Sequence, residues 1–400
     1  MKELTKETEH FIATHLHDDV RQLALKAACH PDVDMTEAVI QIAGRQTAEK
    51  KVPTWAAVEG IRYPVHLSME QCSSEATARL KASLVRGKSF ADLTGGFGID
   101  CSFVARSFSE AHYVERQEAL CELARHNFPL IGLPHVQVHH ADGIAYLRSM
   151  QTQADCLFLD PARRDSHGGK TVAIADCEPD VSLLEPLLVE KGRTVMIKLS
   201  PMLDMGSALQ GLKYLRRLFT VAVNNECKEL IALLKREPDQ EESTKNEVII
   251  SCEQSVDNFT FHEFSFTLSE EREAICPLAD TLETYLYEPG AALLKAGPYR
   301  LIALRYGLKK LHPNSHLYTS DRLIDFPGRR FRVESASGFG KRELKSLLQG
   351  VEKANLTVRN FPTPVAELRK RLKLKEGGDI YLFATTLATG EKVLVKCARL

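Results

Sequence analysis

The chain has 400 residues, more than the roughly 250 to 300 at which a single hydrophobic core stops growing, so several domains are expected. No stretch approaches the ~20 apolar residues of a membrane span, the first residues offer no apolar signal segment, and the ten cysteines form no Cys-x-x-Cys pair. With a formal net charge of -1, the composition predicts a cytoplasmic globular protein with reduced thiols, no membrane contact and no metal site.

The first part of the chain, residues 1–85, predicts helices, because apolar residues recur at spacings of three and four. Residues 86–275 alternate short β-branched runs with amphipathic stretches, the pattern of a parallel sheet with crossover helices. The strands expected here are Ser89–Asp92, Ala111–Glu115, Val136–Ala141, Cys156–Asp160, Thr194–Lys198, Leu218–Val223 and Glu229–Lys235. The last two are separated by only five residues, which predicts an antiparallel hairpin. Runs at Glu247–Cys252 and Phe259–Phe266 would extend this sheet or cover its edge.

A glycine-rich turn follows the first strand, with the sequence Asp92-Leu93-Thr94-Gly95-Gly96-Phe97-Gly98. Glycine is needed where backbone approaches a ligand without a Cβ in the way. A dinucleotide-binding turn would have a further glycine at position 101, where this chain has Cys101. The turn therefore predicts a nucleoside ligand without a pyrophosphate, with Asp92 fixing the loop through its amides. A tight connection would also explain the turn taken alone.

Two further strands end in or next to a carboxylate, Glu115 and Asp142. Open α/β sheets bind ligands at the carboxyl ends of their strands. Glu115 is placed to accept both hydroxyls of a ribose, and Asp142 to accept from an adenine amino group. Either residue alone could instead cap the following helix.

The fourth strand ends in Asp160-Pro161-Ala162-Arg163. Pro161 removes a backbone donor, which leaves Asp160 and the carbonyl groups as acceptors. Such acceptors can orient an amino group for methylation and take its proton. The alternative is a plain Asp-Pro turn at the end of a strand.

The order of these motifs, followed by Ile197-Lys198-Leu199-Ser200-Pro201, resembles class I S-adenosylmethionine-dependent methyltransferases, and among them a bacterial group with a C-terminal THUMP-like domain. The resemblance covers nearly the whole chain. It implies an α/β fold with a Rossmann-like, seven-stranded sheet over residues 86–275, after an N-terminal helical region. Small α+β modules then follow, ferredoxin-like over residues 277–328 and THUMP-like over 329–400. In the last module we expect helices Lys341–Ala354 and Val365–Leu372 and strands Leu356–Asn360, Ile380–Thr386 and Glu391–Lys396.

The resemblance also assigns roles to residues. It implies that S-adenosylmethionine is the cofactor, and that the segment from Leu67 to Glu75 closes over its methionine end. The expected cofactor-binding residues are Asp92, Thr94, Gly96, Gly98, Glu115 and Asp142. Asp160, Pro161 and Arg163 are expected to be catalytic, and Arg164 and Lys198 to contact the substrate. The chain departs from amino-methylating relatives at Ala162 and Arg163, where those have a proline and an aromatic residue, so Arg163 would have to stack on the base.

Basic residues dominate after residue 295, whereas residues 236–290 are acidic, with Glu241 and Glu242 among the carboxylates. The cations are Arg329, Arg330, Arg332, Lys341, Arg342, Lys345, Arg369, Lys370, Arg371, Lys373 and Lys375. This asymmetry and the THUMP-like resemblance predict an RNA partner and methylation of an RNA base nitrogen. Three alternatives stay open: a non-catalytic protein that binds the cofactor and RNA, a methyltransferase acting on a protein or small molecule, and C5 methylation of uracil with Cys177 as nucleophile.

Overall fold

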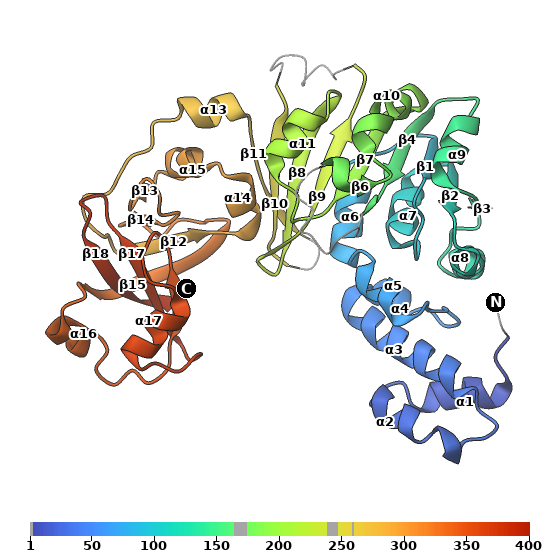
Figure 1. The fold of residues 1–400 in the computed structure, drawn as a ribbon, viewed down its shortest axis with the longest axis horizontal. Coiled ribbons are helices and arrows are strands. Elements are labelled where there is room, and N and C mark those ends of the chain that lie inside the picture. Colours follow the sequence, from blue (N-terminus) through green and yellow to red (C-terminus); the bar gives the residue numbers. More distant parts are fainter. Residues whose placement is uncertain (1–2, 164–173, 238–246, 258–259) are drawn as a thin grey trace. The chain divides into compact units, whose positions relative to one another are not determined.

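The computed structural model describes residues 3–163, 174–237, 247–257 and 260–400, so Arg164, Glu241 and Glu242 lie outside the described residues. The chain forms two compact units (Figure 1). The first comprises Met1–Leu218 and Leu230–Lys245, and the second comprises Phe219–Glu229 and Asn246–Leu400.

The large sheet has the strand order β11-β10-β8-β9-β7-β4-β1-β2-β3 (Figure 1). The bounds are β1 Ser89–Asp92, β2 Glu110–Glu115, β3 Val136–His140, β4 Ala154–Leu159, β7 Gly192–Leu199, β8 Leu215–Val223, β9 Glu226–Leu234, β10 Ile249–Ser255 and β11 Phe261–Phe266. Strands β3, β2, β1, β4 and β7 pair in parallel, and β9 pairs antiparallel with β7. The expected seven strands are therefore present, and β10 and β11 extend the sheet to nine.

The hairpin between β8 and β9 is tighter than the five-residue connection that the sequence suggested. Only Asn224 and Asn225 lie between the strands, and both have left-handed backbone angles, with φ of 53° and 59°. Two asparagines in this conformation form a turn whose twist matches that of the flanking strands. The strands thus extend into residues that the sequence analysis assigned to the loop.

Helices connect the parallel strands of the first unit. They are α7 Ile99–Val104, the 3-10 helix η2 Ala105–Ser107, α8 Glu118–Leu130, α9 Gly143–Ser149, α10 Val181–Lys191 and α11 Met205–Gly211. Aspartates cap three of them: Asp142 for α9, Asp180 for α10 and Asp204 for α11. Each carboxylate accepts from amides of the first turn that have no partner inside the helix. The helices therefore begin where the strand-ending loops place an aspartate.

The N-terminal region is helical, as expected. Its helices are α1 Lys6–Thr14, α2 Val20–Leu25, η1 Ala27–Cys29, α3 Met35–Lys51, α4 Pro53–Ala56, α5 His66–Gln71 and α6 Glu75–Ser83. The Trp55 indole N–H donates to the Ser102 hydroxyl in α7 (3.2 Å), and its ring meets Phe97 edge-on at 5.0 Å. The region thus packs against the glycine-rich turn and the helix that follows it.

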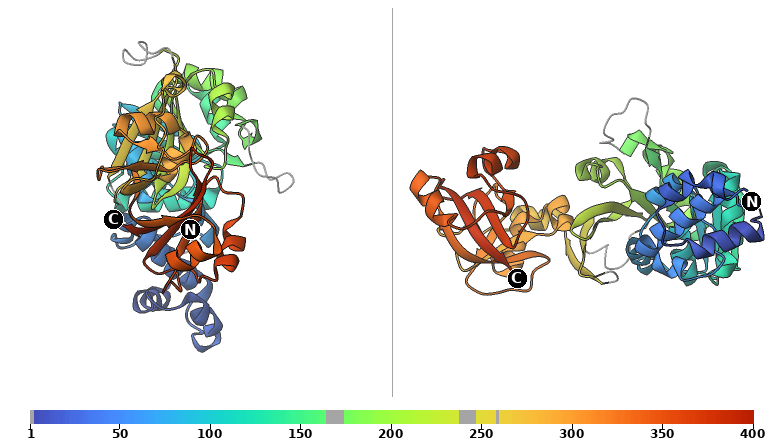
Figure 2. Two further views of the ribbon diagram at one scale, coloured as in Figure 1. Left: turned by 90° about the vertical axis from the view of Figure 1, so that its left-hand side faces the viewer. Right: turned by 90° about the horizontal axis from the view of Figure 1, so that it is seen from below.

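The second unit contains a seven-stranded sheet in the order β13-β14-β12-β15-β18-β17-β16. Its elements are β12 Tyr285–Pro289, α14 Ala291–Ala296, α15 Tyr299–Tyr306, β13 Lys309–Lys310, β14 Tyr318–Ser320, β15 Gly328–Ser337, α16 Lys341–Leu347, β16 Asn355–Val358, α17 Val365–Leu372, β17 Ile380–Thr386 and β18 Lys392–Arg399; helix α13 spans Leu268–Glu273. Leu347 of α16 and Leu368 of α17 share one apolar core with Leu382 and Leu394 of the sheet. Both helices therefore cover the same face (Figure 2).

Helix α16 is shorter than expected, because the sequence predicted a helix over Lys341–Ala354 and the structure ends it at Leu347. Gly350 has φ of 75°, a left-handed conformation that turns the chain out of a helix. Within the described ranges, no helix is long and apolar enough to cross a membrane.

Candidate active site

The glycine-rich turn between β1 and α7 is held by hydrogen bonds from within the sheet. The Thr94 amide donates to Asp92 Oδ1 (3.0 Å), as the sequence predicted for this loop. Gly96 and Gly98 have φ of 56° and 86°, a region that favours glycine. At Gly95 a Cβ would lie 2.3 Å from the Tyr113 ring, so this position has no room for a side chain.

Glu115, at the end of β2, ties this turn to the neighbouring strand. Its Oε2 accepts the Gly96 amide and its Oε1 accepts the Gln117 amide, both at 2.8 Å. The side chain is buried, and each carboxylate oxygen keeps a second lone pair for a ligand. Glu115 therefore shapes the turn as well as offering acceptors at the cleft.

Asp142 is exposed and caps helix α9, with its Oδ1 accepting from Ile144 and Ala145 at 3.0 and 2.9 Å. The capping role that the sequence left open for it is therefore real. Gly143 is the neighbour that lets this loop approach the glycine-rich turn, because a Cβ there would lie 2.0 Å from the Leu93 carbonyl oxygen. The second oxygen of Asp142 is available for a ligand.

Asp160 is connected to two neighbouring strand ends. Its main-chain N–H donates to Thr94 Oγ1 (2.7 Å), and its Oδ2 accepts from Lys198 Nζ (2.6 Å). Lys198 pairs with Asp160 and lines the smaller cavity, and its expected contact with the substrate stays a prediction. The Lys198 side chain is only 14% exposed against 40% for Asp160, so the carboxylate is the more accessible member.

A buried polar group that the sequence analysis missed lies behind the glycine-rich turn. Lys81 of α6 is fully buried, and its Nζ lies 3.0 Å from Asp100 Oδ1 and donates to the Ser73 hydroxyl (3.1 Å). Ser73 in turn donates to Asp100 Oδ2 (2.7 Å). A lysine on an amphipathic helix gave no signal in the sequence, because its partner comes from another element.

The pKa values of two carboxyl groups in the site, Asp92 and Asp100, are shifted in opposite directions. Burial raises the pKa of Asp92 well above its ordinary range; the Thr94 amide opposes this, and the nearby carboxylates of Asp100, Asp160 and Glu115 add to it. Burial also acts on Asp100, but Lys81 and Lys198 more than offset it and the pKa of Asp100 is lowered. Burial therefore favours the neutral form of Asp92, whereas the neighbouring lysines favour the ionised form of Asp100.

Two adjoining cavities at the carboxyl ends of the strands bring these residues together. One, of about 360 Å³, is lined by Glu115, Asp142 and Ala162 among others. The other, of about 190 Å³, is lined by Asp92, Asp100, Lys198 and, as expected for the segment before β1, by Ser68 and Ser73. Thr94, Gln117 and Asp160 line both cavities, so Asp160 lies where the two meet.

The residues after Asp160 are only partly described. Pro161 is buried, and the backbone of Ala162–Arg163 forms the short strand β5, which pairs with β6, Cys177–Glu178. The side chain of Arg163 lies outside the described residues, as does Arg164. Cys177 is buried, and Glu178 and Pro179, but not Cys177, are among the described residues that line the larger cavity.

The side chains that line the cleft fit a nucleoside that carries a positively charged tail. Acceptors dominate the cleft, since Asp92, Glu115, Asp142 and Asp160 all line it against Lys198 and Arg116. S-adenosylmethionine has a sulfonium and an ammonium group, both of which suit carboxylate neighbours. The ribose and adenine ends would have Glu115 and Asp142 for partners, as the sequence analysis predicted.

Comparisons with known proteins agree with this geometry. Residues 285–327 match a ferredoxin-like domain family and residues 328–399 a THUMP domain-like family. The chain is 35% identical to the crystal structure of a "putative methyltransferase" from Porphyromonas gingivalis W83, covering 99% of this chain and 100% of that one with a TM-score of 0.85.

An "uncharacterized S-adenosylmethionine-dependent methyltransferase" of Mycobacterium tuberculosis is 23% identical over 327 residues, which are 81% of this chain and 84% of the relative. The resemblance seen in the sequence is thereby confirmed, and with it the α/β fold and the cofactor. The chain belongs to the class I S-adenosylmethionine-dependent methyltransferases with C-terminal ferredoxin-like and THUMP-like domains.

Proposed function

We propose that this methyltransferase acts on a nitrogen of an RNA base, and that Asp160 orients this nitrogen by accepting its hydrogen bonds. The observation that carries the proposal is the position of Asp160 at the meeting point of the two cavities. One cavity has the acceptors expected for a nucleoside, and the other those expected for an amino-acid tail. The reacting centre of the cofactor lies between these two parts of the molecule.

When bound, S-adenosylmethionine supplies an electrophilic methyl group, so the protein has to orient the nitrogen that accepts it. Asp160 uses Oδ2 for Lys198, which leaves Oδ1 and the main-chain carbonyl to accept hydrogen bonds from an amino group. Those bonds would direct the nitrogen lone pair and give the leaving proton a base. Lys198 would keep the carboxylate in position through the reaction.

The cofactor would be held by residues already described. Glu115 and Asp142 are assigned to the ribose and adenine, Thr94, Gly96 and Gly98 to the turn that surrounds it, and Asp92 to its cationic tail. A Cβ at Gly96 would meet no atom closer than 3.7 Å, whereas one at Gly98 would lie 2.9 Å from the Phe128 ring, so the two glycines are needed for different reasons.

RNA as the substrate is supported by the THUMP-like domain and by the exposed cations of helices α16 and α17. Not all of the predicted basic residues are available for phosphate. Arg329 pairs with Glu288, Arg330 with Asp325, and Arg369 donates to the carbonyls of Ala354 and Lys375. The exposed set is Arg332, Lys341, Arg342, Lys345, Lys370, Arg371, Lys373 and Lys375.

The test is Asp160→Asn, which keeps the size of the side chain while removing its charge. We expect methyl transfer to bulk RNA to fall by about a hundredfold or more, while S-adenosylhomocysteine still binds within a few-fold of wild type. Glu190→Gln, which changes an exposed carboxylate of α10, should leave both properties unchanged.

The natural target is found by mass spectrometry of nucleosides from a strain without the gene and from its parent. Loss of an N-methylated nucleoside would support the proposal. An active Asp160→Asn enzyme would remove Asp160 from the mechanism. A covalent RNA adduct that needs Cys177 would replace nitrogen methylation by C5-pyrimidine chemistry.

A further inference from the structure

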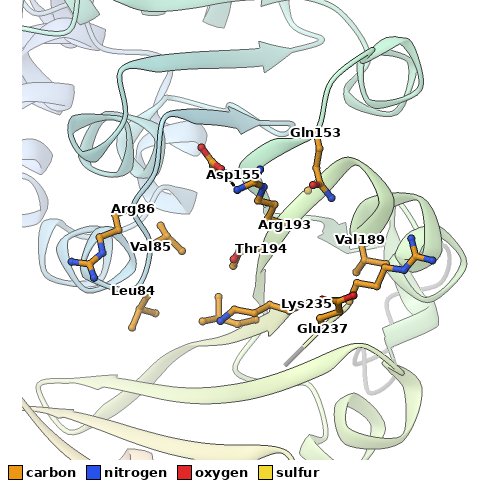
Figure 3. A pocket seen from close by; sticks show the side chains of 13 residues that line it. Leu84, Val85, Arg86, Gln153, Asp155, Val189, Arg193, Thr194, Lys235 and Glu237 are labelled. Carbon is orange, nitrogen blue, oxygen red and sulfur yellow. Dashed lines mark ion pairs between the residues drawn. The ribbon is translucent and has the colours of Figure 1, made fainter. Parts of the chain in front are cut away.

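A cavity of about 600 Å³ lies at the amino ends of the parallel strands of the large sheet (Figure 3). Its walls come from four segments, within residues 84–86, 153–155, 189–194 and 233–237. Strand β4 begins at Ala154 beside this cavity and ends at Leu159 beside the cofactor cleft. The five steps from Ala154 to Leu159, at ~3.3 Å each, separate the two sites by about 17 Å, so a ligand here is neither the cofactor nor the group that accepts the methyl.

The walls of the cavity combine apolar and polar groups. Leu84, Val85, Val189 and Leu233 form the apolar part of the lining, although the last three expose little surface. Gln153 and Thr194 add hydrogen-bonding groups; the Gln153 amide donates to the Glu190 carbonyl (3.2 Å), which leaves its side-chain oxygen as an acceptor. Most of the lining residues are polar or charged, and the volume is in the range of small-molecule sites.

The charges around the cavity favour an anion. The basic side chains that line it are Arg86, Arg193, Lys235 and Arg236, and the acidic ones are Asp155 and Glu237. Four cations around one hollow repel one another, and a bound anion relieves that repulsion. Figure 3 shows Arg193, on strand β7, and Lys235, directly after strand β9, among the side chains that line the hollow.

Asp155 and Glu237 offset only part of this positive charge, because the lining has four basic side chains against these two carboxylates. Asp155 Oδ2 accepts from the amides of Lys88 and Ser89 at 2.7 and 3.1 Å, and its Oδ1 lies 3.5 Å from Arg193 (Figure 3). The Lys88 amide is the largest cause that lowers the pKa of Asp155. Asp155 thus holds one side of the Arg193 guanidinium. The Arg193 side chain stays 72% exposed and can donate to a ligand.

We propose that this cavity binds a nucleoside phosphate, distinct from the methyl donor. The phosphate would take the donors of Arg193, Lys235 and Arg236, a base or ribose would lie against Val189 and Leu233, and Gln153 and Thr194 would hydrogen-bond its edges. A free nucleotide and a nucleotide within an RNA chain share this chemistry. The proposal does not depend on RNA being the methyl acceptor.

The experiment is calorimetric titration of the full-length protein with AMP, GMP, CMP and UMP, after saturation with S-adenosylhomocysteine to fill the cofactor cleft. At least one nucleotide should bind the wild-type protein. Lys235→Gln and Arg193→Gln should each weaken it by about tenfold, the usual effect of removing a charge-assisted hydrogen bond. Lys26→Gln and Arg21→Gln, matched changes of exposed residues at helix α2, should bind like wild type.

Competition with a short single-stranded RNA then identifies the source. If the RNA displaces the mononucleotide and binds the same two variants more weakly, the natural ligand is a nucleotide within RNA. If the RNA does not compete, the natural ligand is a free nucleotide. The proposal fails if none of the four nucleotides binds, or if the two cavity variants bind as tightly as the controls while melting at the wild-type temperature. It also fails if nucleotide binding occurs only without S-adenosylhomocysteine, since the nucleotide is then in the cofactor cleft.

Discussion

At the scale of single residues, the cofactor cleft gathers carboxylates that would repel one another if all were ionised. Lys81 balances Asp100, and Lys198 balances Asp160. Asp92 is balanced in another way, because burial raises its pKa and favours the protonated form. A cationic cofactor would relieve the remaining repulsion, so the cleft is arranged for a ligand with positive charge.

This balance predicts that Asp92→Asn stabilises the cofactor-free protein increasingly as the pH rises. Asparagine keeps an oxygen for the Thr94 amide but cannot ionise. Since folded Asp92 has a pKa above its ordinary 3.8, the folded chain holds a proton that the unfolded chain releases. Stability contributed by this residue is therefore present below about pH 4 and is lost as the pH rises through the folded pKa. The advantage of the variant should grow by about 1.4 kcal/mol per pH unit between the two pKa values.

Urea unfolding followed by the fluorescence of Trp55, the single tryptophan of the chain, measures this difference. Trp55 is a local reporter because it is buried against Phe97 of the glycine-rich turn. Asp32→Asn, an exposed aspartate of the N-terminal region, is the control and should show no such trend. A difference that stays constant between pH 4 and pH 7 would show that Asp92 is ionised in the folded protein.

At the scale of elements, the turn between β1 and α7 depends on close packing against β2. The Tyr113 ring beneath it is fixed, because its hydroxyl donates to the Gly96 carbonyl and the ring makes a T-shaped contact with Phe128, with 5.4 Å between the ring centres. Gly95→Ala places a methyl group against this ring and should destabilise the unit by about 1 to 3 kcal/mol. S-adenosylhomocysteine should also bind more weakly, since the displaced turn lines its site.

The matched change is Gly211→Ala in helix α11, where a Cβ would meet only Ile174 at 3.7 Å. Alanine favours helix over glycine, so this variant should be neutral or up to about 1 kcal/mol more stable. Thermal unfolding and calorimetry compare the two. Equal stability of both variants would mean that the turn relaxes around the added methyl group.

The elements of the sheet were largely predictable, because each parallel strand is a short apolar run and loops with Gly, Asp or Asn follow. Strand β1 and helix α17 have the predicted bounds. Helix α16 was overestimated, since Leu347, Leu348 and Val351 continue an amphipathic pattern that the conformation of Gly350 interrupts. Local patterns do not report which residues meet across elements.

In the candidate site too, some features could be predicted from local sequence patterns and others could not. Strand-end carboxylates could be proposed because parallel strands bring their carboxyl ends to one edge. Three interactions could not be predicted, because each joins residues distant in the sequence. They are the pairing of Lys198 with Asp160, that of Lys81 with Asp100, and the hydrogen bond from Arg369 to the Ala354 carbonyl. The cofactor roles of Glu115 and Asp142 stay predictions.

At the scale of the whole molecule, exposed lysines of the THUMP-like domain should determine how RNA binding depends on salt. Replacing Lys370, Lys373 and Lys375 by glutamine removes three exposed cations at and after α17. If each contacts a phosphate, the slope of log affinity against log salt should fall by about two to three units. The loss should be similar for all RNA sequences tested, because phosphate contacts position RNA without specifying it.

The control replaces Lys6, Lys26 and Lys50, three exposed lysines of the N-terminal region, by glutamine. It changes the net charge by the same amount, so its salt slope should match that of wild type. Filter binding of the full-length protein at several salt concentrations gives the slopes. Equal slopes for both triple variants would assign RNA contact to another surface.

Strand β12 of the ferredoxin-like module pairs with β15 of the THUMP-like module. The two modules can be separated in the sequence, but they share one sheet and we expect them to fold together. Tyr285 to Pro289 of one module pair with Gly328 to Arg332 of the other, and Glu288 holds both Arg329 and Arg359. A chain cut between them would expose two unpaired strand edges, which invite pairing with other molecules, and would bury a carboxylate without its partners. Recombination that separated the two modules would therefore yield aggregating products, so we expect evolution to transfer them as a single inherited block.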